Sequence, residues 1–293
     1  MPAAVIVLGL LSALSWGLAD FGGGIASRRA PVAAVLITTQ LAGAAMSLAI
    51  ALALGEGWPS GTDLGWSLAS SLFGGVGLAC LYIGLARGRM GVVAPITGVL
   101  VATIPAVVGI ALQGVPSAGV LVGIALAISS VLVVSRVGGG DDGRPSGLAW
   151  GLAAGVTLGV VTITLSQMTP GLVFGPLTVM RLGEAALVVV AIVVVPRIAR
   201  PSRNDDDASW RLPRSLWPAM LGIGAFDMLG TGFYIAATQS GPLAIAGVLS
   251  ALYPVTTVVL AVTILRERLA RWHLLGIAIA LSAIVLITTG SSG

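Results

Sequence analysis

Long apolar stretches separated by short polar segments make up almost the whole chain. Ten such stretches begin near Ala3, Pro31, Leu64, Met90, Ser117, Ser146, Gly171, Trp217, Gly241 and His273. An α-helix needs roughly 20 apolar residues to cross a bilayer, and these stretches are far too long for the alternating strands of about 10 residues in an outer-membrane barrel. The pattern therefore predicts an all-α polytopic membrane protein with ten transmembrane helices.

Composition and the placement of charge support a membrane topology. Hydrophobic residues make up 57% of the chain and charged residues 9%, whereas soluble domains have about a quarter charged residues. Fourteen of the fifteen basic residues, all arginines, lie in connections that follow the odd-numbered stretches. Because positive loops stay in the cytoplasm, this predicts that both termini lie outside. The net charge of +4 then reflects membrane orientation and not nucleic-acid binding. We therefore expect a lipid bilayer and no nucleic acid as partners. Arginine without lysine is typical of a bacterial source, which places the chain in an inner (plasma) membrane.

The chain also contains an internal repeat. The segment GVLVATIP at 98–105 matches GVLSALYP at 247–254 at five of eight positions. We expect a first five-helix repeat at 1–136, a cytoplasmic linker at 137–147 and a second repeat at 148–293. An odd number of helices in each half makes the two copies run in opposite directions, which predicts an inverted repeat and alternating access. The matched Pro105 and Pro254 are candidate hinges, and simple packing kinks are the alternative.

Glycines at regular spacing favour close helix packing. The segment GLAAGVTLG at 151–159 has overlapping small-xxx-small spacings, which allow two helix backbones to approach closely. This signal predicts a contact without naming the partner helix.

Several local motifs resemble a known family. Trp16-Gly17 late in the first helix, Leu265-Arg266-Glu267-Arg268-Leu269 at the end of the ninth, and Gly276 in the last are similar to marks of the drug/metabolite transporter superfamily, EamA type. That family usually has Gly-Glu where this chain has Arg266-Glu267. The resemblance covers almost the entire chain and implies two five-helix repeats and secondary transport, mostly export, of small metabolites or drugs.

Charged residues inside the apolar stretches are the candidate functional groups. Arg181 and Glu184 lie near the middle of the seventh stretch, Asp227 at similar depth in the eighth, and Asp20 late in the first. A charge at the centre of a membrane helix costs about 2.5–3.5 kcal/mol. Arg181 and Glu184 are spaced to neutralise each other, which is the structural alternative. Desolvation favours the protonated form of a buried carboxyl group, so Asp227, Glu184 and Asp20 are candidates for proton coupling.

Polar side chains on two helices extend this candidate site. Asp227 continues through Thr231, Tyr234 and Thr238 on one helix face, and Ser12, Trp16 and Asp20 form a comparable stripe on another. Such stripes point toward the bundle interior, although an interhelical hydrogen-bond seam would give the same pattern. The candidate substrate contacts are Arg181, Trp16, Gln40, Tyr253 and Tyr234. Substrate charge stays open, because Arg181 suits an anion and the carboxylates suit a cation.

The sequence argues against an enzyme and against an ATP-driven pump. It has one histidine and one cysteine and lacks a phosphate-binding G-x-x-x-x-G-K-[ST] loop, so we expect no cofactor and no metal site. We expect a secondary transporter, an exporter of a small molecule coupled to protons by antiport. A uniporter or exchanger, a channel and a structural membrane subunit remain alternatives. A monomer is compatible with the sequence, which leaves the oligomeric state open.

Overall fold

The computed structural model describes residues 2–88, 90–135, 147–194, 213–265, 272, 275–276, 278–279, 282–283 and 285–286. The described residues are helical almost throughout. The helices are α1 (Pro2–Ala26), α2 (Val32–Leu54), α3 (Gly61–Arg87), α4 (Met90–Gln113), α5 (Ala118–Ser135), α6 (Leu148–Leu165), α7 (Phe174–Val194), the short 3-10 helix η1 (Arg214–Leu216), α8 (Trp217–Ser240), α9 (Leu243–Ser250) and α10 (Tyr253–Leu265). The all-α prediction is confirmed for this part of the chain.

Seven of the described helices are long and apolar enough to cross a membrane: α1, α2, α3, α4, α6, α7 and α8. Their outward faces carry exposed leucine and valine side chains, such as Leu52, Leu72 and Val193. Polar groups such as Gln40 and Arg181 are buried instead. This reverses the arrangement of a soluble protein, and it is what a bilayer solvent requires.

The ninth expected span, beginning near Gly241, is not one helix. It forms α9 and α10, which are separated by a turn at 251–252. Pro254 lies in the first turn of α10, where its missing N–H leaves no helical hydrogen bond unmade. Its match in the repeat, Pro105, lies inside α4, which continues to Gln113. The tenth expected span, beginning near His273, falls largely outside the described residues, and so does most of the linker at 137–147.

Local signals explain where the helices begin and end. The α2 helix ends at Gly55, whose φ of 64° is left-handed and favours glycine. The α3 helix begins at a capping box, in which the Ser60 side chain accepts from the backbone N–H of Asp63 and the Asp63 carboxylate accepts from the backbone N–H of Ser60. These caps fix the short connection between α2 and α3.

Glycine-rich faces hold the bundle together. The 151–159 segment of α6 packs on α4, with Gly155 against Leu100 and Gly159 against Ile104. A Cβ atom added at Gly159 would lie 2.6 Å from the Ile104 side chain, so a larger residue would require that side chain to move. The prediction of close helix packing from this segment is confirmed.

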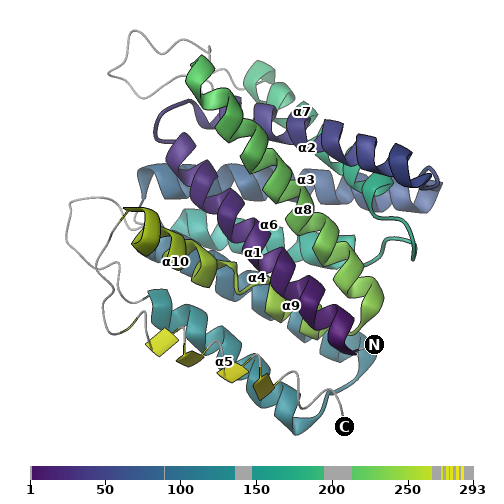
Figure 1. Ribbon diagram of the computed structural model, residues 1–293, viewed down its shortest axis with the longest axis vertical. Helices are drawn as coiled ribbons and strands as arrows, with labels where there is room; N and C mark the ends of the chain where they lie inside the picture. The colour runs from purple at the N-terminus through teal and green to yellow at the C-terminus, as the bar shows by residue number, and fades with distance from the viewer. Residues whose placement is uncertain are drawn as a thin grey trace.

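The helix α1 also packs on its neighbours through glycines, as α6 does. It runs antiparallel to α8 and also packs against α9 and α10 (Figure 1). Gly9 meets Leu249 of α9, and Gly17 meets Thr256 of α10. The helices α2 and α7 pack on each other, α2 also contacts α8, and α7 also contacts α3. Residues from α1, α3, α7, α8 and α10 line a common cavity.

Candidate functional site

A buried arginine is the centre of the polar interior. Nη1 of Arg181 donates to Oδ2 of Asp227 at 2.5 Å, to Oε1 of Gln40 at 2.7 Å and to Oε2 of Glu184 at 3.2 Å. Nη2 donates to the backbone oxygen of Asp227 at 2.9 Å and to Oγ1 of Thr231 at 2.7 Å. Arg181, Glu184 and Gln40 are each 2% exposed or less. One guanidinium therefore joins α2, α7 and α8.

The expected Arg181–Glu184 pair is confirmed, since the two side chains form an ion pair at 3.2 Å. The sequence did not show that Arg181 also pairs with Asp227. Gln40 completes the link, because its Nε2 lies 3.5 Å from Oδ2 of Asp227. The local neutralisation expected on one helix is thus part of a network that spans three.

The two expected polar stripes face each other. Nε1 of Trp16 on α1 donates to Oγ1 of Thr231 on α8 at 3.3 Å. The rings of Trp16 and Tyr234 stack with centroids 5.6 Å apart. The Tyr234 hydroxyl donates to the backbone oxygen of Thr162 on α6 at 2.9 Å. Part of each stripe therefore forms hydrogen bonds between helices, and Tyr234 packs against Trp16 and Thr162.

A cavity of about 60 Å³ lies beside this network, large enough for a few water molecules. Four of its lining residues are charged: Asp20, Arg181, Glu184 and Asp227. Trp16 and Tyr253 also line it, whereas Gln40 and Tyr234 do not. The remaining lining residues are Gly74, Leu78, Leu81, Val101, Leu158, Val161, Thr162, Leu165, Met180 and Thr231. The cavity thus brings together most of the residues singled out from the sequence.

The candidate hinges lie apart from the cavity wall. Pro105 packs on Gly247 of α9, where an added Cβ atom would lie 2.6 Å from the proline ring. This contact joins the two matched repeat segments, 98–105 and 247–254. Pro254 follows Tyr253, which does line the cavity. A movement at the start of α10 would therefore move a cavity side chain.

Three buried polar atoms at the cavity have no hydrogen-bond partner among the described residues: Nε of Arg181, Oε1 of Glu184 and the hydroxyl of Tyr253. Oε1 of Glu184 lies against Gly74 of α3, where an added Cβ atom would come within 2.2 Å of it. Gly74 was not singled out from the sequence, although it provides the space for this carboxylate. Buried polar atoms normally find partners in the protein or in ordered water, so these three atoms are available to water or to a ligand in the cavity.

Carboxylates outnumber cations at the cavity. Its described lining residues include three carboxylates, Asp20, Glu184 and Asp227, and one guanidinium, Arg181, so their formal charge is minus two when all are ionised. Asp20 forms no ion pair with a described residue, whereas Asp227 and Glu184 share Arg181. No group of three or more histidine, cysteine, aspartate or glutamate side chains within the described ranges is placed to hold a metal ion.

A second polar cluster lies at one end of the bundle. The Glu56 carboxylate accepts from the backbone N–H groups of Val173, Phe174 and Gly175 at 2.7–3.0 Å, at the start of α7. Asp63 accepts from the backbone N–H of Thr169 at 2.9 Å. These contacts tie the α2–α3 connection to the α6–α7 connection.

The C-terminal end of α8 joins the same cluster. The Gln239 side chain donates to the backbone oxygens of Thr169 and Leu172 and accepts from the backbone N–H of Gly171. We call Glu56, Asp63 and Gln239 the end latch. The only sequence signal for the end latch is an acidic residue near the start of a helix.

Comparison with known proteins places this architecture in a family. Two stretches of the chain, residues 3–136 and 145–289, match the model of the EamA-like transporter family. The chain belongs to this family. It is a multi-pass membrane protein, and EamA-like proteins are in general transporters and not enzymes.

Twenty-eight chains of solved structures also match this EamA-like protein. One of them, described only as a crystal structure of a protein, is 18% identical and superposes with a TM-score of 0.72 over 97% of this chain and 96% of that chain. This likeness shows a shared fold. No curated protein matches the chain.

Proposed function

We propose that this EamA-like protein is a secondary active transporter that exports a small metabolite or drug in exchange for protons. The observation that carries the proposal is the cavity in the interior of the bundle, where carboxylates outnumber cations among the described lining residues and one buried carboxylate oxygen has no described partner. Ionisable groups inside a membrane bundle mark substrate and proton pathways.

The helix packing supports alternating access between two inverted halves. Under the repeat alignment, α1, α2 and α3 correspond to α6, α7 and α8, and α4 corresponds to α9 with α10. The contacts follow this exchange: α1 packs on α9 and α10 as α6 packs on α4, and α2 packs on α8 as α7 packs on α3. Two halves of this kind can swap conformations around a central site.

The mid-membrane location of the charges supports a coupling role. Arg181 lies seven residues after the first residue of α7 and Asp227 ten residues after the first residue of α8. At about 1.5 Å per residue these positions are roughly 10–15 Å inside the helix ends. A binding site there can be opened to either side without moving the charges themselves.

We assign the proton to the three carboxylates, with unequal roles. Asp227 and Glu184 each pair with Arg181 through one oxygen, Oδ2 and Oε2, whereas Asp20 pairs with no described cation. All three carboxylates line the cavity and are therefore placed to exchange protons with it, and Asp20 is the one that Arg181 does not hold. Trp16, Arg181, Gln40, Tyr234 and Tyr253 would shape the substrate site.

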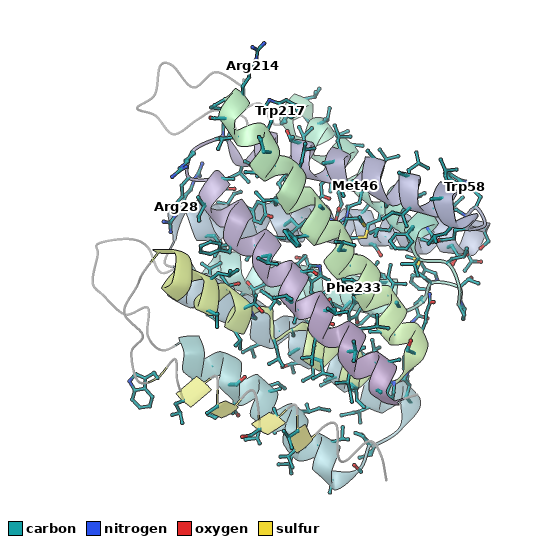
Figure 2. The ribbon with its side chains drawn as sticks, in the orientation of Figure 1. Arg28, Met46, Trp58, Arg214, Trp217 and Phe233 are labelled. Carbon is teal, nitrogen blue, oxygen red and sulfur yellow. The ribbon has the colours of Figure 1, made fainter. Side chains whose placement is uncertain are left out.

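The distribution of arginine supports the proposed orientation. Arg28 and Arg214 lie toward one end of the bundle and Trp58 lies at the other (Figure 2). By the positive-inside rule the arginine end faces the cytoplasm, which leaves the end latch and the start of α1 outside. In a bacterial inner membrane protons enter down their gradient, so proton antiport expels the substrate.

The proposal is tested in proteoliposomes that contain a pH-sensitive dye. Amino acids, sugar phosphates, nucleosides and cationic drugs are added in turn to the wild type, to Glu184→Gln and to the matched control Glu56→Gln. We expect at least one compound to move protons in the wild type and the control, and none to do so in Glu184→Gln. Labelled compounds that equilibrate through the wild type without any proton movement would instead make the protein a uniporter or an exchanger.

A further inference from the structure

We infer that the substrate of this cavity carries a positive charge, as a protonated amine or a similar cation on an apolar body. The inference rests on the proposed transport function and names its substrate class. It follows from three features of the cavity: an arginine whose terminal nitrogens are already bound, carboxylate oxygens that have no described partner, and aromatic rings beside them.

Arg181 is not available to an anionic substrate. Its two terminal nitrogens already donate to Gln40, Glu184, Asp227 and Thr231. Only Nε is without a described partner, and it is buried. An anion that reached the guanidinium would have to displace a buried carboxylate and leave it without a cation, which is strongly unfavourable.

The carboxylates have the opposite property. Asp20 lines the cavity and pairs with no described cation, and Oε1 of Glu184 has no described partner although the side chain is 1% exposed. Arg181 can neutralise only one of the three negative charges. A cation in the cavity would therefore gain the charge-assisted hydrogen bonds that the protein itself leaves unmade.

Aromatic side chains provide a second, independent indication. Trp16 and Tyr253 line the cavity with Asp20, and the buried Tyr253 hydroxyl has no described hydrogen-bond partner. Tryptophan and tyrosine faces attract cations, most strongly where water is excluded. Tyr253 can also hydrogen-bond a second polar group of the substrate.

The rest of the wall selects the body of the substrate. It is mostly aliphatic, with Leu78, Leu81, Val101, Leu158, Val161 and Leu165. Such a wall favours a compact apolar group attached to the cation. The charged and titratable groups around a bound cation would be Asp20, Glu184, Asp227, Arg181 and Tyr253, with Tyr82 buried nearby on α3.

This assignment would also account for the proposed exchange with protons. A proton and a substrate cation bind the same carboxylate oxygens, so each excludes the other. The cavity would carry either a cation or protons across the membrane, which gives antiport without a separate proton site.

The test is a binding measurement on the full-length protein in lipid nanodiscs, by isothermal titration. Amines from ethylamine to 2-phenylethylamine are each compared with the alcohol and the carboxylate of the same shape. A charge-assisted hydrogen bond predicts that the amine binds about 10- to 100-fold more tightly than the alcohol. We expect Asp20→Asn to lose that advantage and Glu56→Gln, outside the cavity, to keep it. Amines that bind no better than their neutral partners, or carboxylates that bind best, would overturn the assignment.

The same compounds in dye-loaded proteoliposomes separate the two proposals. If the carboxylates or alcohols move protons and the amines do not, the cation assignment fails and the transporter stands. If the amines bind through Asp20 but cross the membrane in neither direction, the site assignment stands and the transport proposal fails.

Discussion

Replacing Arg181 with methionine tests the network at its centre. Methionine fills a similar volume without charge, so Asp227 and Glu184 lose the guanidinium that binds them at 2.5 and 3.2 Å. Removing one partner of a buried ion pair costs about 3–5 kcal/mol. We expect Arg181→Met to lower the free energy of unfolding by that amount at pH 7.

The cost should depend on pH, because the stranded carboxylates can take up protons. For a carboxyl with an ordinary pKa near 4, adding a proton costs about 4 kcal/mol at pH 7 and only about 1.4 kcal/mol at pH 5. The folded variant then holds a proton that the unfolded chain releases, so its stability rises as the pH falls. We expect the difference from the wild type to shrink by about 2–3 kcal/mol between pH 7 and pH 5.

The assay is unfolding in mixed micelles by titration with sodium dodecyl sulfate, followed by circular dichroism at both pH values. Arg214→Met is the matched control, since Arg214 is exposed at the start of η1 and should change stability by less than about 0.5 kcal/mol. Replacing Arg181, Glu184 and Asp227 together by apolar residues should recover most of the loss. A single variant as stable as the wild type, or a loss equal at both pH values, would refute the reasoning.

Three further predictions concern glycine packing, the end latch and a buried hydrogen bond. Gly230→Ala should lower stability by about 1–3 kcal/mol, because its Cβ atom would lie 2.5 Å from Cδ1 of Trp16. The control is Gly222→Ala on the same helix, whose Cβ atom would meet nothing within 4 Å and which should raise stability by about 0.5–1 kcal/mol. Thermal unfolding measures both changes. Glu56→Gln should cost about 0.5–2 kcal/mol through the weakened cap of α7, and unchanged hydrogen exchange of the amides at 173–175 would contradict it. Tyr234→Phe should lose about 1 kcal/mol, because a buried carbonyl loses its donor, while an unchanged unfolding midpoint would show that the bond contributes nothing.

Features encoded by local spacing were predictable. The positions of the first eight expected helices followed from apolar length, the packing of 151–159 followed from glycine spacing, and the Arg181–Glu184 pair followed from a separation of three residues on one helix. The two polar stripes also indicated inward faces correctly. Each of these depends on geometry within one helix, which sequence spacing determines.

Features that depend on the register between helices were not predictable. Asp227 reaches Arg181 across α7 and α8, and Glu56 reaches the start of α7 from a separate connection. The space that Gly74 leaves for Glu184 likewise requires α3 and α7 to be in place. The two matched proline segments also differ in structure: a turn precedes Pro254, whereas the helix continues through Pro105. Tertiary packing decides whether a proline segment stays helical.

Uphill accumulation is the most direct test of secondary active transport by this chain. Proteoliposomes with an imposed pH gradient are given the labelled compound that moves the most protons, and its internal concentration is followed with and without a protonophore. We predict that the compound accumulates on the acidic side of the membrane, above its concentration on the other side, and that the protonophore abolishes this accumulation. Equilibration to equal concentrations on both sides, unaffected by the gradient, would contradict coupled transport and indicate a channel or a uniporter.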